Sequence, residues 1–331
     1  LAGTYDGIVR YHRPGDAAAL ASVRQHQDAI KTVSAVETRN GLIVASAGQD
    51  RVVKLSAIES SGGDRPQLAP YARSNDAVHE NSIECSTFVT LPGAEKPQLV
   101  TGDWDGKICL WDLPARGEAG GDDGAAKVTK KRRRAGEAAG QADERVMVGA
   151  QDWKAHAQCV SGVAWDGSVL YSSSYDHSIK AWDLEKGNPV STVNTTRVAT
   201  GICIPPQQGG SSIAMACADG RVRLWDLRAG GVALESEPEK QGVSSFLKAT
   251  LRFHKQWCSA VAWDPTSQYG LASACHAGRL GVWDLRSLGS PVHALRGSEE
   301  KALALAWLSN AAGIVCGGSD ARVRVFRAGA E

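Results

Sequence analysis

A short pattern recurs seven times along the 331-residue chain, and it restricts the fold more than any other feature. In each copy, a run of small and apolar residues leads to a turn, and a segment of alternating side chains follows the turn. Six of the seven turns hold an Asp, and four copies end in Trp-Asp. The turn residues are Asp6, Asp50, Asp105, Asp176, Asp219, Ala277 and Asp320. Each copy must therefore form the same structural unit.

Repeats of about 40–45 residues with this signature are typical of WD-repeat propeller blades, which are four-stranded antiparallel sheets. A turn such as Asp105-Gly106 favours a tight hairpin, because Gly tolerates positive φ and Asp accepts hydrogen bonds from its own backbone. The sequence predicts an all-β fold, a seven-bladed WD-repeat β-propeller that spans residues 1–331.

The two ends of the repeat pattern are incomplete. The first copy begins at its second strand, near residues 1–5, and the last copy stops after its third strand, near residues 323–327. We expect blade one to lack its first strand and blade seven its outer strand. An N-terminal segment usually supplies that outer strand in propellers, so we also expect a lost N-terminal extension and exposed strand edges.

A buried turn Asp needs a partner, because a buried unpaired charge is costly. In WD-repeat proteins the partner is a His before the first strand of the blade. The candidate pairs are His26 with Asp50, His79 with Asp105 and His156 with Asp176. His254 precedes the blade that carries Ala277, while Thr195 and Gly297 stand near the His position of blades five and seven. We expect blades five and seven to depend more on packing.

Residues 115–150 break the repeat spacing between the third and fourth copies. They are rich in Gly, Ala, Glu and Asp and poor in apolar residues, which predicts a disordered insert. The insert carries a basic run of Lys127, Lys130, Lys131, Arg132, Arg133 and Arg134. Such a run indicates a nuclear-import signal or a nucleic-acid contact. The alternative is a solvated loop with no binding role.

The residue before each turn is expected to face the rim of the central channel. Around the ring these residues are Tyr5, Gln49, Trp104, Tyr175, Ala218, His276 and Ser319. Exposed aromatic side chains are common binding anchors. Our hypothesis is that Tyr5, Trp104 and Tyr175 form part of a protein-binding patch. The alternative is that Trp104 and Tyr175 pack on neighbouring loops.

Signatures of the common catalytic classes are missing from the sequence. It contains no GxSxG, no HExxH and no glycine-rich phosphate loop. Four of the eight His fall at the repeat position, and no two of the eight Cys are spaced as CxxC. The sequence predicts a binding scaffold and not an enzyme, with no cofactor and no metal site. No apolar run is long enough to span a membrane, and the net charge of +1 gives no general attraction to nucleic acid.

Beyond the repeat itself, the chain resembles the WD repeat-containing protein 12 family of ribosome-biogenesis factors, also called the YTM family. The resemblance is carried by Gly102-Asp103-Trp104-Asp105, by the basic insert after the third blade, and by residues 173–183, 218–226 and 317–323. It covers nearly the whole chain. Ala277, and Ser56 in the tryptophan slot of blade two, depart from the usual blades.

The resemblance implies a nucleolar complex with Pescadillo- and BOP-type proteins on the pre-60S ribosomal particle, in which large-subunit rRNA matures. It implies a location in the nucleus, nucleolus and nucleoplasm, and it leaves a direct contact with pre-rRNA open. Family members also carry an N-terminal ubiquitin-like domain that an AAA ATPase engages. We expect that contact to be lost here, because this sequence does not include the domain.

The residues alone leave a second interpretation open, in which the chain is a different WD-repeat adaptor. This would be a component of another nuclear complex, such as a ubiquitin-ligase substrate receptor or a chromatin reader. The basic insert fits both readings, because both place the protein in the nucleus.

Overall fold

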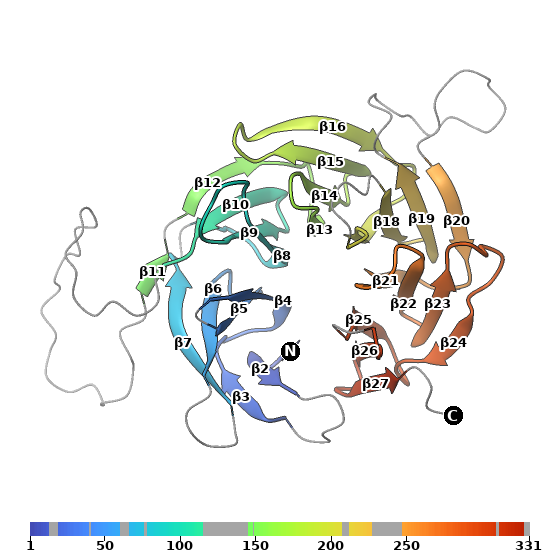
Figure 1. Cartoon of the computed structure of the whole chain (residues 1–331), viewed down its shortest axis with the longest axis horizontal. Coiled ribbons are helices and arrows are strands. Elements are labelled where there is room, and N and C mark those ends of the chain that lie inside the picture. Colours follow the sequence, from blue (N-terminus) through green and yellow to red (C-terminus); the bar gives the residue numbers. More distant parts are fainter. Residues whose placement is uncertain are drawn as a thin grey trace, which may run out of the picture.

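Seven β-sheets stand in a ring in the computed structural model (Figure 1). The structure describes residues 1–12, 19–39, 41–59, 66–75, 78–114, 145–147, 149–206, 212–226, 247–308 and 311–327. All regular secondary structure in these ranges is β. The predicted all-β, seven-bladed WD-repeat propeller is confirmed.

Each blade is antiparallel, and in blades two to six the earliest strand of the blade lies nearest the ring axis (Figure 1). Blade two contains β4 (Ile30–Thr38), β5 (Gly41–Gly48), β6 (Val53–Glu59) and β7 (Gln67–Ser74). Blade three contains β8 (Ile83–Val89), β9 (Gln98–Asp103), β10 (Lys107–Asp112) and β12 (Gly149–Lys154). Blade four contains β13 (Val160–Trp165), β14 (Leu170–Ser174), β15 (Ser178–Asp183) and β16 (Asn188–Asn194). Blade five contains β17 (Ala199–Cys203), β18 (Ser212–Cys217), β19 (Arg221–Asp226) and β20 (Leu247–Arg252). Blade six contains β21 (Cys258–Trp263), β22 (Gly270–Cys275), β23 (Arg279–Asp284) and β24 (His293–Arg296).

Blades one and seven have three strands each in the described part of the chain. Blade one contains β1 (Ala2–Gly3), β2 (Ile8–Tyr11) and β3 (Ala21–Arg24), and blade seven contains β25 (Ala302–Trp307), β26 (Gly313–Gly318) and β27 (Val323–Arg327). Blade one thus lacks its first strand and blade seven its outer strand, as predicted. On β27, Val323 and Val325 are exposed.

The apolar core lies mainly between neighbouring blades. In blades three to six, the next-to-last residues of the third strands are all at most 2% exposed, and they are Trp111, Trp182, Trp225 and Trp283. The eight cysteines are free, and seven of them are buried. Burial raises the pKa of Cys109 to about 12. These thiols therefore serve as small apolar side chains, as the sequence predicts.

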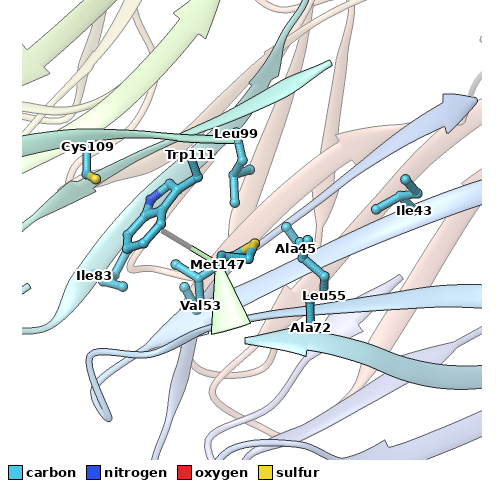
Figure 2. Packing of buried hydrophobic residues seen from close by; sticks show 11 residues of the cluster. Ile43, Ala45, Val53, Leu55, Ala72, Ile83, Leu99, Cys109, Trp111 and Met147 are labelled. Carbon is cyan, nitrogen blue, oxygen red and sulfur yellow. The ribbon is translucent and has the colours of Figure 1, made fainter. Parts of the chain in front are cut away.

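The C-terminal end of the predicted insert is ordered as strands, so the prediction of disorder over residues 115–150 is wrong there. β11 (Arg145–Met147) pairs in parallel with β7, and β12 begins at Gly149. Met147 is 1% exposed and packs with Leu55 and Trp111 between blades two and three (Figure 2), whereas Val146 is 55% exposed. Burial of one apolar side chain and the hydrogen bonds of β11 hold this segment against blade two. Residues 115–144, with the whole basic run, lie outside the described residues.

Candidate functional site

Blade four shows the complete hydrogen-bonded network that supports the rim. His156 Nδ1 lies 3.0 Å from Asp176 Oδ2, and its Nε2 lies 2.7 Å from Ser172 Oγ. Trp182 Nε1 donates to the same Ser172 oxygen over 2.7 Å. Burial acts to raise the pKa of Asp176, but hydrogen bonds from His156 and Ser178 more than offset it and leave the pKa lowered. The network ties three segments of one blade together, and the predicted pairing of His156 with Asp176 is present.

Blade two repeats this network with one replacement. His26 Nδ1 lies 2.8 Å from Asp50 Oδ2, and its Nε2 lies 2.7 Å from Ser46 Oγ. Ser56 stands where blades three to six have tryptophan, and it accepts a hydrogen bond from Gln25 Nε2. Ser46 Oγ donates to Gln25 Oε1 over 2.9 Å. The Gln25 side chain thus takes the structural place of the missing indole.

In blade three the predicted partner is wrong: His79 pairs with Asp103 and not with Asp105. His79 Nδ1 lies 2.8 Å from Asp103 Oδ2, and its Nε2 lies 2.8 Å from Thr101 Oγ1. Side chains two residues apart on a strand share a face, so Asp103 joins Thr101 on the face that meets the His. Asp103 is 1% exposed, whereas Asp105 is exposed and accepts from Asn81 Nδ2 over 3.2 Å.

Blades five and seven pair the turn Asp with an Arg on the following strand, so the expectation that they depend more on packing is wrong. Arg223 donates to both carboxylate oxygens of Asp219, over 3.0 and 2.8 Å. Arg324 Nη1 lies 2.6 Å from Asp320 Oδ2. Burial acts to raise the pKa of Asp320, but the hydrogen bond from Arg324 offsets this and leaves it at about 2. A forked guanidinium replaces the missing His.

Blade one lacks such a pair in the described residues. Asp6 is exposed and accepts a hydrogen bond from the Thr4 hydroxyl. We expected the turn acids to be largely buried, and this is wrong for Asp6 as it is for Asp105. The Asp6 carboxylate bonds within its own turn and the Asp105 carboxylate bonds Asn81, and neither makes a described contact with a His.

Blade six keeps the His without the acid. His254 Nε2 lies 2.8 Å from Ser273 Oγ, which also accepts from Trp283 Nε1 over 2.9 Å. Ala277 offers no carboxylate, and His254 Nδ1 is buried without a hydrogen-bond partner among the described residues. Burial, with a smaller contribution from the charge of Arg279, lowers the pKa of His254 to about 4.

Above these networks, the rim is built from backbone-linked pairs. In blades two to seven, the N–H of the residue before the turn donates to the carbonyl of the residue that precedes the first strand, over 2.9 to 3.1 Å. The rim pairs are Gln49 with Ala29, Trp104 with Ser82, Tyr175 with Cys159, Ala218 with Val198, His276 with Trp257, and Ser319 with Lys301. The repeat thus places two side chains per blade at the same edge of the ring.

The structure brings together two of the three side chains predicted to form the binding patch. The Trp104 and Tyr175 rings are T-shaped, with their centroids 5.9 Å apart, and Trp104 is 48% exposed. Tyr5 is 63% exposed, but its described ring contact is with Lys31 of blade two, whose Nζ lies 5.8 Å from the ring centroid. Trp104 and Tyr175 therefore form one exposed aromatic cluster, and Tyr5 stands apart from it.

A fourth exposed aromatic was missed by the sequence analysis. Trp257 is 49% exposed and stacks on His276, with centroids 5.9 Å apart and planes 18° apart. The turn residues alone do not reveal Trp257, because it belongs to the series of residues that precede the first strand of each blade. That second series contains one aromatic residue, which is Trp257. Alignment of the loops that precede the first strand of each blade identifies Trp257.

The polar side chains beneath the rim hold the blades together. Among the residues that the structure describes, no group of three His, Cys, Asp or Glu side chains could hold a metal ion. No helix in the described ranges is long and apolar enough to cross a membrane. Three of the described His form hydrogen-bonded pairs with an Asp that help to hold the blades.

Comparison with known proteins gives concordant results. The family model described as WD domain, G-beta repeat matches residues 79–112, 150–183 and 245–284. A Chlamydomonas reinhardtii protein named "Ribosome biogenesis protein WDR12 homolog" is 31% identical to the chain, over 98% of the chain and 70% of that protein. Proteins with the same name from Oryza sativa subsp. japonica and Nematostella vectensis are 28% and 27% identical, each over 98% of the chain. The chain covers 69% and 72% of those two proteins.

Proposed function

The chain belongs to the WDR12 family of ribosome biogenesis proteins, and from this premise we propose that it is a non-enzymatic scaffold in assembly of the large ribosomal subunit. A role in ribosome biogenesis follows from the names of its relatives, and it indicates a nuclear or nucleolar location. The finer proposal is a complex with Pescadillo- and BOP-type proteins on the pre-60S particle, in which pre-rRNA matures. The resemblance in the sequence supports this choice of partners.

The scaffold proposal rests on one observation. The rim exposes aromatic side chains, while the polar side chains beneath them are already hydrogen-bonded to one another. Trp104 is 48% exposed, although tryptophan is costly to leave in water. His156, which lies below the same rim, is 2% exposed, and both of its ring nitrogens are engaged. An exposed aromatic cluster on a rigid frame is suited to bind a protein partner.

Affinity purification of the tagged chain from cells, followed by mass spectrometry and RNA detection, tests the choice of complex. We expect large-subunit assembly factors of the Pescadillo and BOP type, together with pre-rRNA. Recovery of a cullin adaptor or of histones in their place would reject the proposal in favour of another nuclear adaptor.

The double variant Trp104→Ala, Tyr175→Ala tests the surface. We expect several-fold less of the pre-60S proteins in the purification, with a nearly unchanged melting temperature. Val190→Ala on β16, at a residue that is 62% exposed on an outer strand, is the matched control and is expected to behave as wild type. A large fall in melting temperature of the double variant would instead assign the two rings to the core.

The basic run, which lies outside the described residues, is proposed to be a nuclear-import signal or an RNA contact. Replacement of Lys130, Lys131 and Arg132 to Arg134 by Gln tests both roles. Exclusion of the tagged variant from the nucleus supports import. A normal location with a weaker dependence of RNA binding on salt supports contact, because released counterions set that dependence. No change in either measurement would mean that the run has no binding role.

A further inference from the structure

Trp257 is the exposed member of a two-ring stack with His276. It lies in the loop between β20 and β21, where its carbonyl accepts the N–H of His276 over 2.9 Å. The two rings lie within 18° of parallel, and Trp257 keeps 49% of its surface exposed. A third flat ring can therefore continue the stack on the solvent side. The backbone link holds the stack in place before any ligand arrives.

Cationic side chains flank this stack on two neighbouring loops. Lys255 is exposed two residues before Trp257. Lys301, which occupies in blade seven the position of Trp257 in blade six, is also exposed, and its charge acts on His276. The acidic residues of the Lys301 loop have partners of their own, because Glu300 accepts from Ser319 Oγ over 2.8 Å and Glu299 lies 3.9 Å from Arg322.

The cluster of Trp104 and Tyr175 has a different geometry. Its rings are at 72° to each other, so Trp104 does not continue a parallel stack. The carboxylate of Glu84 is close enough to raise the pKa of Tyr175, after a larger effect of burial and a contribution from Cys159. A nearby carboxylate disfavours a phosphate group. The two exposed tryptophans of the rim thus suit different ligands.

We propose that Trp257, backed by His276 and flanked by Lys255 and Lys301, is a stacking subsite for one base of single-stranded RNA. Aromatic side chains beside cations are the usual elements of such sites, because every base has a flat face and every nucleotide carries a phosphate. This inference rests on the proposed function, which brings the chain to pre-ribosomal RNA. It deepens that function by assigning RNA and protein to different sectors of one rim.

Binding of a fluorescein-labelled oligouridylate to the purified chain, measured by anisotropy at low salt, tests the subsite. The background chain carries Gln at residues 130–134, so that the basic run makes no contribution. Trp257→Ala is expected to weaken binding by about five- to a hundred-fold, the range seen for loss of one stacked base. Trp257→Phe keeps a flat ring and is expected to retain most of the affinity. Lys301→Gln is expected to reduce the salt slope by about one counterion.

Val190→Ala on the outer strand β16 is the control, because Val190 is 62% exposed and Trp257 is 49% exposed. Equal losses in the two alanine variants, unchanged affinity in Trp257→Ala, or no binding by the background chain would each overturn the subsite. Binding of an arginine-rich peptide that depends on Trp257 while oligouridylate binding does not would overturn it as well. Failure of the wild-type chain to recover pre-60S proteins from cells would reject the proposed function without altering these purified-component results.

Discussion

At the scale of the residue, the acid that holds each blade is selected by the strand face it shares with its partners. Asp103 reaches His79 because it alternates with Thr101 along β9, and Asp219 reaches Arg223 across its own turn. Blades two, three, four, five and seven all keep the carboxylate, while the side chain that pairs with it is either His or Arg. A buried acid demands a donor, and either an imidazole or a guanidinium meets that demand.

The pairing of His79 with Asp103 in blade three gives a direct prediction. Asp103→Ala is expected to lower the free energy of unfolding by about 2–4 kcal/mol, because it leaves buried His79 and two turn N–H groups without their acceptor. Asp105→Ala is expected to cost less than about 1 kcal/mol, since Asp105 is exposed. Urea denaturation of the two variants checks this, and a larger loss for Asp105→Ala would contradict the assignment.

In blade six a carboxylate can be added instead of removed. Ala277→Asp restores the carboxylate that His254 Nδ1 lacks, so we expect the free energy of unfolding to rise by about 1–2 kcal/mol. The pKa of His254 is expected to rise from about 4 at the same time. Denaturation together with NMR titration of the His254 ring measures both. Ala277→Asn, which supplies an acceptor without charge, is the control, and a destabilised Asp variant would contradict the geometry.

The pH dependence of stability follows from the same histidine. The folded pKa of His254, about 4, lies below its ordinary value of 6.5, so the unfolded chain binds the proton first as pH falls. This group therefore removes stability as pH decreases from about 6.5 to 4, by up to roughly 3 kcal/mol. The lowered pKa values of Asp50 and Asp176 act in a separate window, because their stabilisation is lost only below about pH 4.

Urea denaturation between pH 7 and pH 4.5 checks this window. The wild-type chain is expected to lose stability steadily as the pH is lowered, and Ala277→Asp is expected to show a flatter slope. Identical slopes in the two proteins would show that His254 does not set the dependence.

At the scale of the element, β11 connects two blades, and the repeat pattern of the sequence does not predict it. It adds a parallel strand to β7, and the chain then continues into β12 of the next blade. Its last residue, Met147, enters the core between blades two and three, while Val146 faces solvent. A short strand of this kind depends on the side chain that it buries.

Met147 and Val146 form a matched pair for testing this element. Met147→Ala is expected to lower the free energy of unfolding by about 2–4 kcal/mol, because it empties a packed site. Val146→Ala is expected to change it by less than about 0.5 kcal/mol, since the side chain is 55% exposed. Equal effects of the two substitutions on urea denaturation would mean that β11 does not bury Met147 in solution.

The sequence predicted the blades because the turn and the third strand carry their own signal, as in Asp176 followed by Trp182. It could not predict β11, because three residues beside a charged insert show no period and their partner strand is far away in the chain. The Arg pairs were within reach, since Arg223 and Arg324 both stand four residues after a turn Asp. Trp257 was missed because only one of the two series of rim positions was compared.

At the scale of the whole molecule, the ring separates the hydrogen-bonded networks from the rim, where we propose that partners bind. The hydrogen-bonded networks lie inside the blades, and the rim pairs repeat around one edge of the ring. Because the backbone positions repeat, a change of side chain at the rim alters what the molecule binds with little effect on how it folds. Trp104 with Tyr175 and Trp257 with His276 are two such local changes on one frame.

Site-specific cross-linking in cells tests the central claim most directly, because it reports which part of the ring touches pre-ribosomal partners. A photo-reactive amino acid is placed at position 104 on the rim and, in a second protein, at position 190 on the outer strand β16, where both native side chains are exposed. The account predicts cross-links from position 104 to large-subunit assembly proteins and none above background from position 190. Cross-links to those proteins from position 190 alone would contradict it.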